Sequence, residues 1–150
     1  MIDIRTYDRR RRPAESELHE IAGFLFRHLD EFGDPQHEIE QAIRYSLESA
    51  GDKPGGGLVL AAYSGDMLAG AVVINRTGMS GYIPENILVY IATHNELRGK
   101  GIGRMLMQKA IGETEGDIAL HVEADNPAKR LYESLGFTNR YLEMRLKKNK

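Results

Sequence analysis

A nearly uninterrupted apolar segment, Asn86–Thr93, is followed closely by a turn with three glycines and then by a helical pattern. Apolar residues on both faces of a strand predict a position at the centre of a sheet. The helix expected after the turn carries Ile102, Met105, Leu106 and Ala110 mostly on one face. A buried strand that turns directly into an amphipathic helix predicts a layered fold of helices on a sheet.

Five further segments have the composition of strands. They are Ile2–Thr6, Leu58–Tyr63, Met67–Asn75, Asp117–Glu123 and Tyr141–Leu146. Ser64-Gly65-Asp66 predicts a hairpin between the second and third strands of the chain. In the last segment, Leu142, Met144 and Leu146 are expected to face inward as a closing strand.

Two helices are predicted between the first two strands, each with one apolar face. The first carries its apolar residues over Leu18–Phe32, with Pro13 in its first turn, and Gly33-Asp34-Pro35 ends it. The second carries them over Ile39–Ala50, with Gly51 as its C-terminal stop. The element order β-α-α-β-β-β-α-β-α-β predicts an α/β (α+β) fold, in which helices flank a mixed sheet.

The composition predicts a single domain over residues 1–150, with 41% hydrophobic and 28% charged residues. The net charge of −2 argues against a nucleic-acid partner. Arg9-Arg10-Arg11-Arg12 is therefore expected to be a solvated loop rather than an RNA or phosphate contact. No signal peptide and no apolar run of about 20 residues is present, so a cytoplasmic protein with no membrane partner is expected.

Metal and thiol chemistry are not expected. The chain has no cysteine, which excludes disulfides, thiolate metal sites and cysteine nucleophiles. The five histidines lack the spacing of metal ligands. They are His19, His28, His37, His94 and His121. Residues 51–57 are glycine-rich, but no Gly-Lys-Ser/Thr follows them, so they are not a nucleotide P-loop.

The turn after the buried strand has the residues of an anion site. It reads Arg98, Gly99, Lys100, Gly101, Ile102, Gly103, Arg104. Exposed backbone N–H groups at a helix start carry the positive end of the helix dipole. Glycines let that backbone turn tightly and approach a ligand, and three basic side chains add fixed charge. The alternative is a tight turn without a ligand, whereas a dinucleotide fingerprint fits poorly because Arg104 stands where a glycine is needed.

A second segment, Asn126–Phe137, predicts a helix capped by Asn126, with Pro127 first and Gly136 just past its end. Together the two segments resemble the GNAT superfamily of N-acetyltransferases. The acyl-CoA loop of that family, Gln/Arg-x-x-Gly-x-Gly/Ala, is matched by Arg98, Gly101 and Gly103. The later family pattern is matched by Ala128, Leu131-Tyr132 and Gly136-Phe137. The usual asparagine position is Asp125 here, and Asn126 comes one residue later, so either residue is a candidate for the asparagine's role.

The resemblance implies a mostly antiparallel sheet splayed between its fourth and fifth strands, with acetyl-CoA as co-substrate. The pantetheine arm is then expected to bond backbone groups of Ile91, Ala92 and Thr93 in that gap, as an added strand would. The pyrophosphate is expected on the N–H groups of residues 99–104. Many relatives close with a two-strand hairpin, and little chain remains after Phe137 for one.

The implied reaction is direct attack by a primary amine of a small molecule or peptide on the thioester in a ternary complex. Deprotonating an alkylammonium of pKa about 10.4 at pH 7 costs roughly 4.6 kcal/mol. Removing this proton with a base is therefore a larger demand than protonating the departing thiolate. Relatives often carry a carboxylate on the fourth strand, but Leu88–Thr93 has none. Glu85, His94 and Glu123 are the nearby candidates, and the resemblance implies that Tyr132 donates a proton to the departing thiolate.

Two other functions remain open: a module that binds acyl-CoA without turnover, for which Tyr132 is not needed, and a protein without a ligand. A monomer or a homodimer is expected. Acceptor contacts in relatives usually come from the first two helices, where acidic residues hint at a cationic amine. These residues are Asp30, Glu31, Asp34, Glu38 and Glu40.

Overall fold

Five strands form one sheet whose order in space follows the chain, β1-β2-β3-β4-β5. The structure is a computed structural model and describes residues 1–48 and 56–148. The strands are β1 (Ile2–Tyr7), β2 (Gly57–Ser64), β3 (Met67–Arg76), β4 (Asn86–Thr93) and β5 (Ile118–Leu120). The pairs from β1 to β4 are antiparallel, and β4 pairs with β5 in parallel. The predicted mixed, mostly antiparallel sheet is confirmed.

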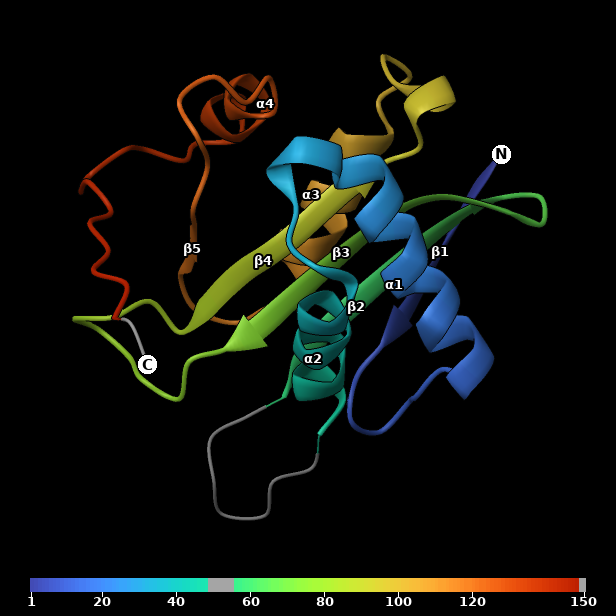
Figure 1. Ribbon diagram of the computed structural model, residues 1–150, viewed down its shortest axis with the longest axis horizontal. Helices are drawn as coiled ribbons and strands as arrows, with labels where there is room; N and C mark the ends of the chain where they lie inside the picture. The colour runs from blue at the N-terminus through green and yellow to red at the C-terminus, as the bar shows by residue number, and fades with distance from the viewer. Residues whose placement is uncertain (49–55, 149–150) are drawn as a thin grey trace. The chain divides into compact units, whose positions relative to one another are not determined.

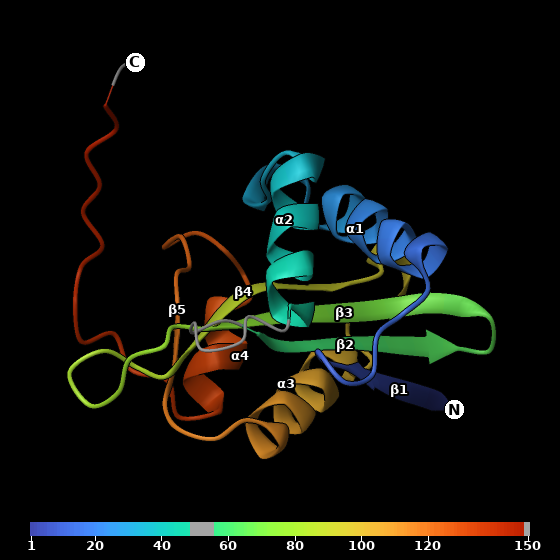
Figure 2. The same ribbon diagram turned by 90° about the horizontal axis from the view of Figure 1, so that it is seen from below.

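Four α-helices and two short 3₁₀ helices are assigned within the described residues. They are α1 (Glu15–Leu29), η1 (Asp30–Phe32), α2 (Gln36–Leu47), η2 (Asn95–Leu97), α3 (Ile102–Glu113) and α4 (Lys129–Ser134). The chain forms two compact units, Met1–Leu120 and His121–Lys150. In the first unit, α1 and α2 cover one face of the sheet and α3 covers the other (Figures 1 and 2).

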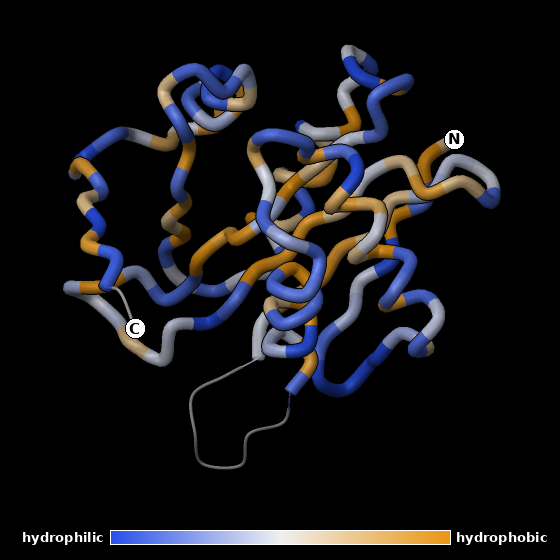
Figure 3. The backbone as a smooth tube through the Cα atoms, in the orientation of Figure 1, coloured by the Kyte–Doolittle hydropathy of each residue, from blue (hydrophilic) through white to orange (hydrophobic). Residues whose placement is uncertain are grey.

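The central strands β2 and β3 are buried along nearly their whole length, because helices cover both faces. Figure 3 shows that much of the backbone of β2, β3 and β4 carries apolar residues. On the α1–α2 side, the core packs apolar residues of both helices against the sheet. Its largest fully buried members are Ile21, Leu25, Ile39, Ile43, Val59 and Val73.

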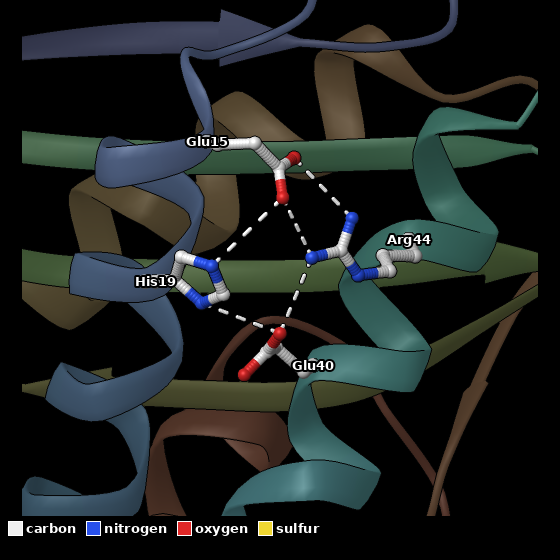
Figure 4. A network of polar contacts seen from close by, with 4 residues as sticks. All are labelled: Glu15, His19, Glu40 and Arg44. Carbon is white, nitrogen blue, oxygen red and sulfur yellow. Dashed lines mark hydrogen bonds and ion pairs between the residues drawn. The ribbon is translucent and has the colours of Figure 1, made fainter.

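Polar contacts join α1 to α2 at their exposed side (Figure 4). The Arg44 guanidinium donates to Glu15 at 2.8 Å and to Glu40 at 3.3 Å. His19 lies 3.3 Å from the same Glu40 carboxylate. The Glu15 and Arg44 side chains are exposed, so this network contributes little to stability and mainly orients the two helices.

Glu17 on α1 ties the helix to the sheet from a half-buried position. Its carboxylate accepts hydrogen bonds from the hydroxyls of Tyr7, at 2.7 Å, and Tyr63, at 2.6 Å. The Arg5 guanidinium lies over the Tyr63 ring at 4.2 Å and 3.5 Å from Glu17. Burial and the Glu17 carboxylate raise the pKa of the Tyr63 hydroxyl. The cluster therefore joins β1, β2 and α1 through paired polar groups.

Helix boundaries differ from the predictions at several points. Pro13 precedes α1, which begins at Glu15. Asp30 ends α1 by adopting a positive φ of 52°, and Phe32 therefore lies in η1 rather than in the helix. In α3, Met105 is 40% exposed, because Met107 takes its predicted place in the core.

Helix α2 ends at Leu47, because the backbone of the next residue, Glu48, adopts an extended conformation. The predicted stop at Gly51, the apolar position Ala50 and most of the loop over residues 51–57 lie outside the described residues. The Arg9–Arg12 loop is confirmed as a loop: Asp8 accepts from the backbone N–H groups of Arg10 and Arg11. Arg12 is anchored by its guanidinium to the backbone oxygen of Leu47.

Two strand predictions near the C-terminus are wrong in extent or existence. The predicted Asp117–Glu123 strand is reduced to Ile118–Leu120. The closing strand at Tyr141–Leu146 is not formed, and the side chains expected inward are exposed. Leu142 is 82%, Met144 90% and Leu146 83% exposed. An alternating pattern specifies a strand only where a neighbouring edge pairs with it, and no strand pairs with these residues in the described part of the chain.

Candidate active site

The sheet opens between β4 and β5. Pairing joins only Asn86–Leu88 of β4 to Ile118–Leu120 of β5. Beyond Leu88, β4 continues to Thr93 with β3 on its other edge, where Ile91, Ala92 and Thr93 pair with Val72, Ala71 and Gly70. No described strand pairs with the second edge of Ile91–Thr93. The predicted splay is confirmed, and this edge offers backbone donors and acceptors to an extended ligand.

The glycine loop comes shortly after the end of that open edge, and the short helix η2 lies between them. Gly99 and Gly101 have φ values of 80° and 81°, in the left-handed region that favours glycine. A Cβ added at either position would meet no atom within 4 Å. The glycines are therefore required by backbone conformation, and the space beside them is open to a ligand.

Helix α3 begins at Ile102 with Gly101 as its N-cap. No side chain caps this end, and the first intrahelical bond runs from Met105 N to Gly101 O. The N–H groups of Ile102 and Gly103 precede that bond, so they have no carbonyl partner within the helix. Together with the helix dipole, they make an anion-binding end.

The three basic residues of the loop have exposed side chains, but they do not act alike. Arg98 donates through Nη2 to the backbone oxygen of His28 at 3.2 Å, which anchors the start of the loop to the end of α1. Lys100 and Arg104 lie on the loop and in the first turn of α3. The Arg98 contact with His28 spans 70 residues, so no local pattern in the sequence indicates it.

Gly70 on β3 determines how closely α3 lies on the sheet. A Cβ at this position would stand 2.7 Å from Leu106 Cδ1 and 3.3 Å from Ile102 Cγ2. Both contacts belong to the helix whose N-terminus faces the open loop. Gly70 thereby positions the anion-binding end, and only the interruption of an apolar strand by glycine signals it in the sequence.

Tyr132 lies in the C-terminal unit on α4 and is 7% exposed. Burial raises the pKa of its hydroxyl to about 12. Gly136 lies just past the end of the helix, as predicted, and has a φ of 101°. Gly136 N donates to Glu133 O, and Phe137 N donates to Tyr132 O, which together form a Schellman cap. This cap fixes the backbone of Tyr132.

Asn126 lies before α4, and the helix begins two residues later than predicted, with Ala128 at the N-cap position rather than Asn126 and with Pro127 outside the helix. The Asn126 side chain accepts from Ala128 N at 2.9 Å, so it organises the turn that enters the helix. Asp125 is exposed.

Two of the three base candidates are engaged in local structure. Glu85 accepts from Asp117 N at 3.0 Å, and this backbone hydrogen bond lowers the pKa of its carboxyl. His94 accepts from Glu96 N at 3.1 Å through Nδ1. Glu123 is exposed in the C-terminal unit. A carboxyl with a lowered pKa is a poorer proton acceptor, which weighs against Glu85 as the base.

A carboxylate from outside the strand does reach β4. The Tyr90 hydroxyl on β4 donates to Asp34, which lies between η1 and α2. Burial, together with Asp34 and Glu38, raises the pKa of Tyr90. Asp34 was predicted only as one member of an acidic group, because a contact across 56 residues leaves no local pattern.

Residues 55–139 match the acetyltransferase (GNAT) domain family. Solved structures with the same fold include the ribosomal-protein-S18-alanine N-acetyltransferase of Escherichia coli. It has 19% identity and a TM-score of 0.70, over 94% of this chain and 80% of that one. An aminoglycoside acetyltransferase from an uncultured soil metagenomic sample has 16% identity and a TM-score of 0.67, over 99% of both chains. A putative acetyl transferase from Pyrococcus furiosus has 25% identity and a TM-score of 0.61, over 97% and 99%.

With the matched segment covering more than half of its length, the chain belongs to the GNAT family of acetyltransferases. The matched family model defines its domain as an acetyltransferase domain. Among the described helices, none has the length and apolar character needed to cross a membrane. Across residues 1–48 and 56–148, no group of three His, Asp or Glu side chains is placed to hold a metal ion.

Proposed function

We propose that the protein transfers an acetyl group from acetyl-CoA to a primary amine of a small molecule or peptide, by direct attack in a ternary complex. The observation that carries the proposal is the continuity of the open β4 edge with the glycine loop. An extended amide-bearing arm and a pyrophosphate are joined in one ligand, and these two features offer partners for both.

In this proposal, Ile91, Ala92 and Thr93 bond the pantetheine amides through their backbone groups. The N–H groups of residues 99–104 hold the pyrophosphate, with Lys100 and Arg104 adding positive charge. Gly99 and Gly101 fit this role because no side chain blocks the approach to their backbone. Asn126 is the further coenzyme contact that we propose from the family pattern.

Tyr132 is the proposed proton donor to the thiolate that leaves when the amine attacks. Its pKa of about 12 keeps the hydroxyl protonated throughout the neutral range. A free thiol has a pKa of about 8.5, so the thiolate leaves readily and the required assistance by a proton donor is modest. Donation by a positioned tyrosine also explains why its backbone is fixed by a helix cap.

The negative charges of Asp34 and Glu38 favour a cationic acceptor. Asp34 accepts a hydrogen bond from the Tyr90 hydroxyl on β4, and both carboxylates raise the pKa of that hydroxyl. The ribosomal and aminoglycoside acetyltransferases that share the fold are named for amine-bearing substrates. We propose the same acceptor chemistry here. Cytoplasmic location is proposed with it, since acetyl-CoA is the co-substrate.

The experiment combines acetyl-CoA titration calorimetry with a screen of amines and peptides that detects free thiol release. Binding with acceptor-dependent thiol release supports the enzyme. Binding without release for any acceptor indicates the non-catalytic acyl-CoA-binding module. No binding at millimolar acetyl-CoA would show that the loop is a tight turn without this ligand.

A further inference from the structure

His28, at the last turn of α1, holds the segment that leads into the glycine loop at two points. Its backbone oxygen accepts from Arg98 Nη2 at 3.2 Å. Its ring Nδ1 accepts from the backbone N–H of Asn95, also at 3.2 Å. One residue therefore fixes both ends of the Asn95–Arg98 segment, which connects the open β4 edge to the loop.

The His28 ring is buried, with only 5% of the residue exposed. It lies against Phe24, at a ring-centroid distance of 4.5 Å, and against His94, at 4.3 Å. Since Nδ1 accepts a hydrogen bond, the neutral ring carries its proton on Nε2. That Nε2 has no hydrogen-bond partner among the described residues. Within residues 1–48 and 56–148, the only hydrogen-bond partner of the ring is thus the Asn95 amide that precedes the loop.

We propose that His28 is a positioning residue for the coenzyme loop: its neutral ring fixes Asn95–Arg98, and protonation releases this segment and weakens acetyl-CoA binding. The inference about acetyl-CoA rests on the function proposed for the loop, whereas the contact between the ring and Asn95 does not.

Protonation of His28 places a hydrogen on Nδ1, and two N–H donors then face each other at the Asn95 contact. On the other side of the ring, Nε2 has no acceptor among the described residues to stabilise the buried charge. The charged and titratable groups around it are Arg27 on α1, His94 after β4, and Arg98 before the loop. Burial is the main cause that lowers the pKa of His28; the hydrogen bond with Asn95 acts in the opposite direction, and these three groups lower the pKa further.

The pH direction follows from that lowered pKa. In the unfolded chain, His28 titrates near 6.5. In the folded protein, it stays neutral to a lower pH, so the ordered segment is fully retained above about pH 6.5. It is lost progressively as the pH falls through the folded pKa. Acetyl-CoA affinity should follow the same change.

The test compares His28→Asn with His28→Leu. The Asn side-chain oxygen stands near the position of Nδ1 and accepts without titrating, whereas Leu fills space without accepting. The acetyl-CoA dissociation constant is measured by calorimetry from pH 5 to pH 7.5. At pH 5, the loss of one hydrogen bond should make wild type bind acetyl-CoA about fivefold more weakly than His28→Asn. His28→Leu lacks this hydrogen bond at every pH, so it should bind about fivefold more weakly than His28→Asn at both pH 5 and pH 7.5.

The phosphates of the coenzyme also titrate near pH 6, so the result is the difference between variants rather than the wild-type curve alone. His37→Asn, at an exposed position on α2, is the matched control and should behave as wild type. An equal acid-dependent loss in wild type and His28→Asn would overturn the proposal.

A measurement without coenzyme separates the two proposals. The amide NMR signal of Asn95 in the wild-type protein should shift with the same midpoint as the His28 ring signals. If acetyl-CoA fails to bind at any pH while this shift is present, the proposed function is wrong and the positioning role stands. An Asn95 amide that is unaffected while His28 titrates overturns the positioning role, whatever binds to the loop.

Discussion

The Phe137 ring meets the Tyr132 ring edge-on, with centroids 6.0 Å apart, and the Phe137 N–H donates to the Tyr132 backbone oxygen at 3.1 Å. The two residues are the ends of the Schellman cap that closes α4. The Leu-Tyr and Gly-Phe pairs of the sequence pattern are thus one physical unit. Gly136 permits the turn, and Phe137 packs on the tyrosine that we place in the reaction.

Tyr132→Phe is expected to lower kcat about 10²-fold, the lower end for general acid catalysis, while the acetyl-CoA dissociation constant stays nearly unchanged. Only the hydroxyl is lost, and the ring contact with Phe137 is kept. Tyr141→Phe, at an 82% exposed position, serves as the matched control. Unchanged turnover in a chemistry-limited assay would exclude Tyr132 as the donor.

Acetyl-CoA is expected to raise the melting temperature. At a hundredfold excess over the dissociation constant, binding should add about 2.7 kcal/mol to the free energy of unfolding. Gly101→Asp should abolish this effect, because it puts a side chain and a negative charge where the pyrophosphate is proposed to bind. Gly65→Asp is the control: Gly65 also has a positive φ, of 64°, and open space beside it. Loss of the ligand effect in both variants would point to general destabilisation instead.

The pH dependence of kcat/KM should reflect the neutral fraction of the acceptor, since no carboxylate lies on β4 itself. For a primary alkylamine, that fraction rises about tenfold per pH unit below the amine's pKa, so the rise should continue past about pH 8. Because burial keeps Tyr132 protonated up to a pKa of about 12, loss of the donor should not interrupt that rise.

His94→Asn keeps an acceptor for the Glu96 amide and removes the titrating ring, so it should leave this profile almost unchanged. A wild-type profile that is flat above about pH 7 contradicts the prediction. If such a profile becomes steep in a variant of His94, Glu85 or Glu123 alone, that residue is the base.

Glu17→Ala is expected to lower the free energy of unfolding by about 2 to 3 kcal/mol, because it leaves two tyrosine hydroxyls without their acceptor. Urea denaturation measures the loss. Glu17→Gln retains an acceptor oxygen and should cost less. Glu20→Ala, at an exposed position on the same helix, should change stability by less than about 0.5 kcal/mol. Equal effects at Glu17 and Glu20 would show that the cluster is not stabilising.

Local patterns were sufficient for most of the fold. Asn86–Thr93 was predicted with its observed bounds, because a continuous apolar run flanked by polar loops has few alternatives. The prediction of a strand over Tyr141–Leu146 is wrong for the complementary reason. Alternation states which residues suit a strand, whereas the existence of a pairing edge depends on distant parts of the chain.

The candidate site divides in the same way. Gly99 and Gly101 were found because a glycine turn before a helix is a local signal. The contacts of His28 with Asn95 and Arg98 span 67 and 70 residues, and that of Tyr90 with Asp34 spans 56. Contacts at such separations leave no periodicity to detect, so the sequence could not predict them.

The strand order of the sheet also has a consequence for how the chain folds. β2, β3 and β4 are neighbours both in sequence and in space, whereas β1 reaches β2 only across α1 and α2. Closing that long connection costs entropy before the pairing yields any stabilisation. We therefore expect Val73→Ala in β3 to slow folding and Ile4→Ala in β1 mainly to accelerate unfolding, as stopped-flow kinetics would measure. On this basis, β1 is expected to join the sheet after β2, β3 and β4 have paired with one another.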